Sequence, residues 1–168
     1  MSTSSAHAHP ELSETAEAMV STGETAFMAA TMKLDGKKMC DILRTSPDTV
    51  NECNSHGQTA LHMLLSSKAQ WDITFPEVCR DDSDWWSKQL VDTLPGKVLL
   101  YLLVRGSDPT ICDHDGANAI ALAYQHDIAA VQSAVIHAIP EEEDAIKAAE
   151  AACAYMMKKK AAGVPPAE

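Results

Sequence analysis

The sequence predicts an all-helical array of short repeated units, and three observations support this fold class. First, 46% of the 168 residues are hydrophobic but only 5% are aromatic, with alanine and leucine supplying the largest share. Such residues favour closely packed helices over strands. Second, Gly23 and Gly57 each open a G-x-T-A segment, with a spacing of 57 − 23 = 34. Third, Gly116 opens a similar segment, G-A-N-A-I-A-L-A-Y. A recurrence of this kind is typical of repeat proteins.

The N-terminal elements are predicted from local composition. Residues 1–9 contain no basic region and no apolar run, and we expect them to form a disordered tail. From Pro10 the chain reads P-E-L-S-E-T-A-E-A-M-V. Because proline fits the first turn of a helix, we expect a short capping helix over residues 10–22 that closes this end of the array.

The middle unit has the clearest repeat pattern. An amphipathic segment, K-M-C-D-I-L-R, precedes a turn phrase, S-P-D-T-V-N, and residues 57–62 then read G-Q-T-A-L-H and open a helical run. Gly57 and Gly116 lie where a turn must lead into a helix, a place suited to a residue that tolerates positive φ. The Thr59 hydroxyl is placed to cap the first helical turn, and Leu61 begins the buried face.

The second helix of this unit is expected to begin near Pro95 and to end at residue 105. Gly106 comes directly after it, where a residue in the left-handed conformation is expected. Ser107, Asp108 and Pro109 then supply turn residues, so the helix stops there.

These phrases resemble the ankyrin repeat family over about residues 20–140. The resemblance implies a solenoid of about three helix-turn-helix repeats within residues 23–140, closed by helical caps. In the family's pattern the ring of His62 donates hydrogen bonds that tie one turn to the next. The third repeat has Asn118 and Ala121 in the threonine and histidine positions, and the first has Met28 in the histidine position. We expect these outer repeats to lack the turn-locking groups, because an end repeat has no further neighbour. The structural residues implied by the resemblance are Gly57, Thr59, Leu61, His62, Gly106, Asp108 and Gly116.

A long insertion interrupts the middle repeat. The spacing from Gly57 to Gly116 is 116 − 57 = 59, about 26 more than one repeat length, and we place the insertion at residues 70–94. It contains all three tryptophans of the chain and a phenylalanine: Trp71, Trp85, Trp86 and Phe75. One interpretation is a local loop or short helix whose rings form a satellite core over a neighbouring repeat. The other is that one of the rings is presented to a partner, since tryptophan is enriched at binding hot spots.

The insertion is also acidic. Residues 70–93 hold six acidic residues against Arg80 and Lys88. We expect Ser83 or Asp84 to cap a short helix that runs to Leu94. The acidic residues before the paired tryptophans suit a partner with a basic surface.

A capping helix is expected at the C-terminal end, over residues 141–160. Acidic residues crowd its first turn after Pro140, and Lys158, Lys159 and Lys160 fill its last turn. The helix dipole favours this distribution, so we interpret the lysines as helix-end charge rather than as a targeting signal. Residues 161–168 are expected to form a second disordered tail.

The composition excludes several classes of partner. The formal net charge of 13 − 24 = −11 disfavours nucleic acid and anionic membranes, since both would repel this surface. No apolar run approaches the roughly 20 residues that span a bilayer. The five cysteines are scattered and form no C-x-x-C pair, as in reduced intracellular proteins. We therefore expect a cytoplasmic or nuclear protein.

No catalytic motif is present. The chain has no nucleophile elbow, no glycine-rich phosphate loop and no H-E-x-x-H pattern, so we predict neither an enzyme nor a cofactor. Two expected turn tips carry potential metal ligands, Cys53 with His56 and Cys112 with His114. These groups would meet around a metal only if the tips converge. Exposed tips are polar without any metal, so we predict no metal site.

Binding to another protein is the function that the resemblance implies, through the turn tips and the inner helices. The matching positions here are Ser55, His56, Gln58, Ser66, Ser67, His114, Asp115, Ala117, Gln125 and His126. This surface lacks large anchors, so Trp71, Phe75, Trp85 and Trp86 are candidate hot-spot residues. We expect a small adaptor that is monomeric alone. The alternative is a stoichiometric inhibitor or assembly chaperone whose acidic face occupies a basic site on its partner.

Overall fold

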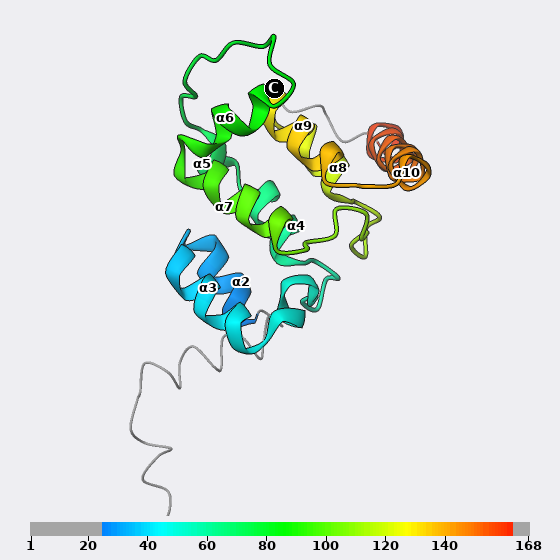
Figure 1. Ribbon diagram of the computed structural model, residues 1–168. Coiled ribbons are helices and arrows are strands. Elements are labelled where there is room, and N and C mark those ends of the chain that lie inside the picture. Colours follow the sequence, from blue (N-terminus) through cyan, green and yellow to red (C-terminus); the bar gives the residue numbers. More distant parts are fainter. Residues whose placement is uncertain (1–24, 163–168) are drawn as a thin grey trace, which may run out of the picture.

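The computed structural model describes residues 25–162, and within this range every regular element is a helix (Figure 1). The prediction of an all-helical protein is confirmed for these residues. The expected tail 1–9, the expected capping helix 10–22, Gly23 and residues 163–168 lie outside the described range. No described helix is long and apolar enough to cross a bilayer.

Six of the helices form three sequential pairs, which a longer helix follows. The pairs are α2 (Ala26–Met32) with α3 (Gly36–Thr45), α4 (Ala60–Ser66) with α7 (Leu94–Val104), and α8 (Ala119–Ala123) with α9 (Ala129–His137). The 3-10 helix η2 (Pro47–Asn51) follows α3, and the long helix α10 (Glu142–Ala161) follows α9.

The first helices of the pairs form a row that ends at α10. α2 packs on α4, α4 on α8, and α8 on α10, and Figure 1 shows this order from the blue to the red end of the chain. Each helix contributes buried apolar side chains, including Phe27 from α2, Leu64 from α4, Ile120 from α8 and Ala152 from α10. Because helices of five to seven residues cannot bury an apolar face alone, the stacking supplies the missing surface.

Residues with left-handed backbone end two of the helices. After α7, Gly106 has a φ of +101°, and the next amide, Ser107 N, donates to Leu102 O at 2.9 Å. This is the Schellman arrangement, which satisfies carbonyls left open at a helix end. After α2, Leu34 takes the corresponding position with a φ of +55°. A side chain in this conformation costs about 1–2 kcal/mol, and Leu34 offsets part of the cost by packing against the core.

The insertion at residues 70–94 contains helical segments that pack on the rest of the molecule. It takes in the end of α5 (Lys68–Trp71) and the whole of α6 (Trp85–Val91), which are joined by non-helical chain. α6 packs against both α7 and α9. The insertion therefore covers the second helices of two successive pairs.

The expectation of one short helix running to Leu94 is wrong in its end point. α6 ends at Val91, because Thr93 caps the next helix: its Oγ1 accepts from Gly96 N at 3.1 Å and donates to Leu90 O at 3.1 Å. Gly96 is needed at this junction, since a Cβ there would lie 2.1 Å from Leu90 O. At the other end Asp84, not Ser83, is the N-cap residue of α6, and its side chain makes no capping bond.

Candidate interaction surface

The turn that leads into α4 is organised by Asn54. Its Oδ1 accepts from His56 N at 2.9 Å and from Gln58 N at 3.0 Å. Its backbone N–H donates to Gln58 O at 2.8 Å, and its carbonyl accepts from Gly57 N at 3.0 Å. Gly57 has a φ of +76°. An asparagine that accepts from the backbone just after it fixes a tight turn of this kind.

The turn that leads into α8 has the same geometry, with Asp113 in place of the asparagine. Asp113 Oδ1 accepts from Asp115 N and Ala117 N, both at 2.9 Å. Its backbone N–H donates to Ala117 O at 2.9 Å, its carbonyl accepts from Gly116 N at 3.0 Å, and Gly116 has a φ of +92°. Every one of these bonds in the first turn thus recurs in the second.

The two turns are in direct contact. His114 N donates to His56 O at 3.0 Å, which joins the tips through the backbone. The ring of His114 lies over Gly57, where a Cβ would be 2.5 Å from the ring carbon Cδ2. Tyr155 of α10 lies over Gly116 in the same way, but at 4.0 Å from the corresponding Cβ position. The turns therefore form a continuous edge that ends at α10.

His62 links α4 to the second turn. Its Nε2 lies 3.0 Å from Ala117 O, and its Nδ1 lies 3.1 Å from Thr59 N and 2.9 Å from Thr59 Oγ1. A carbonyl only accepts and a backbone amide only donates, so the ring is neutral with its proton on Nε2. Burial of the ring lowers the pKa of His62, although the bond to Ala117 opposes this shift. Thr59 Oγ1 also accepts from His62 N at 3.4 Å, which completes a reciprocal cap.

The third pair of helices keeps a turn-locking group, contrary to expectation. Asn118 Oδ1 caps α8 by accepting from Ala121 N at 3.0 Å, and Asn118 Nδ2 donates to Ala148 O of α10 at 2.8 Å. The side chain is fully buried. One asparagine therefore both caps its helix and links it to the next element. The link is made although Ala121 stands where the middle unit has His62.

A second amide joins the loops that precede the two turns. Asn51 Nδ2 donates to Gly106 O at 2.9 Å, and Asn51 Oδ1 accepts from Asp108 N at 2.8 Å. Asp108 in turn accepts from both Thr110 N at 2.9 Å and Thr110 Oγ1 at 2.6 Å. The loops after α3 and α7 are thereby held in register.

Most of the predicted contact positions on the turns and helices lie at least partly at the surface. His56, His114, Asp115, Ser55, Ser66 and Gln125 are exposed, while Gln58, which accepts from Asn54 Nδ2 at 3.1 Å, is half-buried. Ser67 is half-buried and is the C-cap of α4. The exposed members come from the two turns, which precede α4 and α8, and from the C-terminal ends of the same two helices.

Three of the predicted contact residues have structural roles instead. Ala117 is 1% exposed, and its carbonyl holds His62. His126 is buried, and its Nε2 bonds to Leu65 O. Trp71 is 4% exposed, and its Nε1 donates to Leu64 O at 2.9 Å. The prediction that these side chains contact a partner is wrong, because each of them is covered where the chain packs against α4.

The other aromatic rings of the insertion also face the molecule. Phe75 stacks on Trp71 with ring centroids 6.5 Å apart. Trp86 is half-buried and stacks on His137 of α9 at 5.0 Å. Trp85 is half-buried beneath the guanidinium of Arg80, 4.2 Å from the ring centroid. This arrangement supports the interpretation of a satellite core.

The basic residues of the insertion are engaged with the insertion itself. Lys88 Nζ lies 2.8 Å from Asp82 and 3.7 Å from Asp84, and the bond to Asp82 raises the pKa of Lys88. The exposed carboxylates of Glu77 and Asp81 make no ion pair within residues 25–162. The insertion therefore presents two carboxylates without an ion-pair partner among these residues.

Comparisons with family models, with curated proteins and with solved structures return no match for this chain. The geometry described above is therefore the basis on which a function is assigned.

Tyr124 is a surface residue that the sequence patterns do not single out. It is the C-cap of α8 and is 48% exposed. When Gly57 is aligned with Gly116, the position equivalent to Tyr124 is Leu65, which is fully buried. The carbonyl of Leu65 bonds to His126 Nε2, whereas α8 is followed directly by a turn into α9. The same alignment, made on the sequence, would have drawn attention to this substitution.

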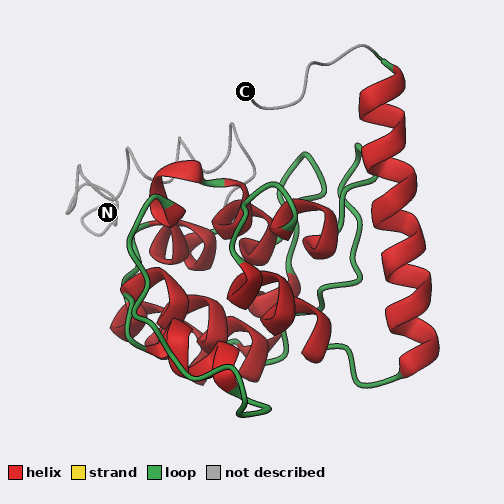
Figure 2. Cartoon of the chain, turned by 90° about the horizontal axis from the view of Figure 1, so that it is seen from above, coloured by secondary structure: helices red, strands yellow, loops and turns green. Residues whose placement is uncertain are grey.

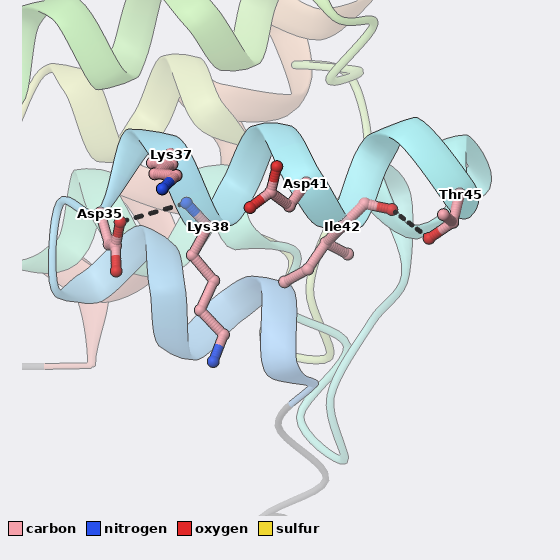
Figure 3. A pocket seen from close by; sticks show the side chains of 6 residues that line it. All are labelled: Asp35, Lys37, Lys38, Asp41, Ile42 and Thr45. Carbon is pink, nitrogen blue, oxygen red and sulfur yellow. Dashed lines mark hydrogen bonds between the residues drawn. The ribbon is translucent and has the colours of Figure 1, made fainter.

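Two hollows lie on the surface of the described residues. One, about 480 Å³, lies along α3 and is lined by Asp35, Lys37, Lys38, Asp41, Ile42 and Thr45 (Figure 3). Asp35 caps α3 through Lys38 N at 3.1 Å, and Thr45 Oγ1 donates to Ile42 O at 3.2 Å. These bonds serve the helix itself. A second hollow of about 380 Å³ lies beside Asn51, between the loop after α7 and the start of α10.

The cysteines and histidines of the two tips form no cluster. No group of three or more histidine, cysteine or acidic side chains among residues 25–162 is placed to hold a metal ion. Cys53 and Cys112 are both exposed. Partial burial of its sulfur raises the pKa of Cys112, and the carboxylate of Asp113 raises it further. This shift disfavours the thiolate, which is the form that binds metals.

Proposed function

We propose that this chain is a protein-binding module built as an ankyrin-type solenoid of about three repeats. The observation that carries the proposal is the recurrence, before α8, of the entire turn that precedes α4, with its bonds. Asn54 and Asp113 organise the two turns, and Thr59 and Asn118 cap the helices that follow. Repeats of this kind stack into extended surfaces that bind other proteins.

The proposed binding surface combines the turn tips, which precede α4 and α8, with the C-terminal ends of these two helices. It presents His56, Ser66, Asp115, Tyr124 and Gln125, all of which are exposed. Tyrosine is common at binding hot spots because it offers apolar area and a hydroxyl on one rigid side chain. Tyr124 therefore takes the anchoring role that the sequence alone assigns to the tryptophans.

Substitutions at the helix ends of this surface test the proposal. Ser66→Arg and Gln125→Arg place a long charged side chain on the surface, and Thr45→Arg places the same side chain on α3, away from it. Affinity purification with mass spectrometry on the wild-type protein identifies partners, and the three variants are then compared for each partner. We expect Thr45→Arg to retain the partner and the Ser66 and Gln125 variants to lose most of it. Loss with Thr45→Arg alone, or full retention by both the Ser66 and Gln125 variants, would refute the proposed surface.

A second candidate function is a stoichiometric inhibitor or assembly chaperone that occupies a basic site. It is favoured by the carboxylates of Glu77 and Asp81, which make no ion pair among residues 25–162. Charge attraction acts on the rate of association and is screened by salt. A fall in the association rate of about tenfold or more between low and high salt, which Glu77→Gln with Asp81→Asn removes, would favour this candidate over the first.

A further inference from the structure

The helix α10 contacts the rest of the molecule along one face only. Ala148 and Ala152 are buried where α10 packs on α8. On the opposite face Ile146 is 53% exposed and Met157 is 71% exposed. Figure 2 shows α10 along one end of the row, with no other described element on its outer side. A helix of 20 residues therefore leaves its outward face without a partner among residues 25–162.

The outward residues of α10 follow a regular spacing. They alternate in steps of three and four along the helix, and all are exposed: Glu143, Ile146, Glu150, Cys153, Met157 and Lys160. This spacing defines the seam along which two helices pack as a coiled coil. Its apolar members lie inside the seam, and its charged ends have opposite sign.

We propose that a second copy of this chain binds to the outward face of α10, with the two helices antiparallel. When Ile146 of one copy faces Met157 of the other, Glu143 faces Lys160 at both ends of the seam, and Glu150 faces Cys153 at its centre. A parallel pair would instead place Glu143 beside Glu143 and Lys160 beside Lys160. Like charges in contact disfavour that arrangement, so the charge pattern selects the antiparallel pair.

The dimer is expected to be weak and reversible. A seam of 20 residues is about 30 Å long, and a single helix pair of this length buries less than the roughly 1,200 Å² of a standard interface. We expect a dissociation constant on the order of 10⁻⁵ to 10⁻⁴ M, as for a transient interface. This proposal replaces the monomer expected from the sequence and does not depend on the proposed function.

Sedimentation of the full chain over about 10 µM to 1 mM tests the proposal. We expect the wild type to shift from monomer to dimer with concentration. Ile146→Lys and Met157→Lys should weaken the dimer at least tenfold. Val104→Lys is the matched control, since Val104 is 82% exposed on α7 and lies off the seam. A wild type that stays monomeric throughout this range, or an equal loss with Val104→Lys, would overturn the proposal.

Charge reversal tests the orientation. In the antiparallel pair, Glu143→Lys alone sets two lysines against each other at each end of the seam, and Lys160→Glu alone sets two glutamates against each other. Each variant should therefore dimerise several-fold more weakly than the wild type at low salt. An equimolar mixture of the two restores opposite charges at both ends and should dimerise within about twofold of the wild type. Circular dichroism checks that both variants keep their helices. Single variants as tight as the wild type, or a mixture no tighter than either variant, would rule out the antiparallel pair.

Discussion

α4 and α8 occupy equivalent places in the row, but polar side chains secure them in different ways. In α4 the work is divided between two residues, since Thr59 caps the helix and His62 reaches the carbonyl of Ala117 in the next turn. In α8 Asn118 does both, capping Ala121 N and donating to Ala148 O. Both junctions thus contain a buried donor, and the residue type that supplies it differs between them.

The reach of the donor explains the choice of residue. The acceptor for α4 is the carbonyl of Ala117, in the turn before α8, and the long imidazole of His62 reaches it. The acceptor for α8 is a carbonyl of the helix α10, which packs closely through Ala148 and Ala152. Small residues on α10 bring its backbone within range of a short amide. A buried donor that finds its acceptor contributes about 1 kcal/mol, and an acceptor left without one costs about 1–3 kcal/mol.

The largest expected effect is that of His62→Ala. The substitution removes one of the two donors to Ala117 O, since Asp113 N still donates to it. It also leaves Thr59 N without the His62 acceptor and removes a fully buried ring. We expect the free energy of unfolding to fall by about 3 kcal/mol, measured by urea denaturation. A loss below about 1 kcal/mol would show that the link between α4 and the second turn is not important for stability.

Asn118→Ala should cost about 2 kcal/mol, because it removes the cap and the donor to Ala148 O together. Asn118→Ser is the matched variant, since serine caps a helix equally well but lacks the amide donor. We expect it to recover about half of the loss. Full recovery by serine in the same denaturation experiment would contradict the proposed link to α10.

The glycines of the two turns offer a comparison of smaller effect. Alanine at either position would have to adopt a positive φ, which costs about 1–2 kcal/mol of stability. A Cβ at Gly57 would also meet the ring of His114 at 2.5 Å and His114 N at 3.0 Å, whereas at Gly116 the nearest atom is at 4.0 Å. We expect Gly57→Ala to be less stable than Gly116→Ala by about 1 kcal/mol in thermal denaturation. Equal losses would mean that the turns are not in contact in solution.

The smallest expected effect is a dependence on pH that belongs to α4 alone. Burial lowers the pKa of His62 in the folded state below its ordinary value of 6.5. Between these two pKa values the unfolded chain binds more protons, so this contribution to stability is complete above about pH 6.5 and falls as the pH drops through that window. The slope contributed by one group is at most about 1.4 kcal/mol per pH unit. His62→Gln should flatten the stability profile just below about pH 6.5, whereas Asn118→Ser should leave its slope unchanged.

The sequence is informative where a local rule decides the structure. Gly57, Gly116 and Thr59 follow from turn and capping preferences, and the acidic and basic ends of α10 follow from the helix dipole. The Asx turns at Asn54 and Asp113 carry a local signal as well, since both stand three residues before a glycine.

Tertiary contacts decide the remaining features, which local patterns do not reach. Trp71 and His126 lie in segments that the sequence predicts to be at the surface. Each ring is buried, and its nitrogen bonds to a carbonyl of α4. The break between α6 and α7 depends on a close approach at Gly96. The contact of His126 spans 61 residues of chain, whereas that of Trp71 spans seven, so neither follows from the pattern of a single helical turn.

The position of α6 has a consequence for how the chain folds and opens. In a simple solenoid each unit touches only its neighbours, so units can unravel one at a time from either end. Here α6 packs on both α7 and α9, so one helix contacts both the second and the third pair. We expect these two pairs to unfold as one cooperative block and the pair α2–α3 to open separately at lower free energy. Native-state hydrogen exchange would then show two protection classes, with the boundary near η2.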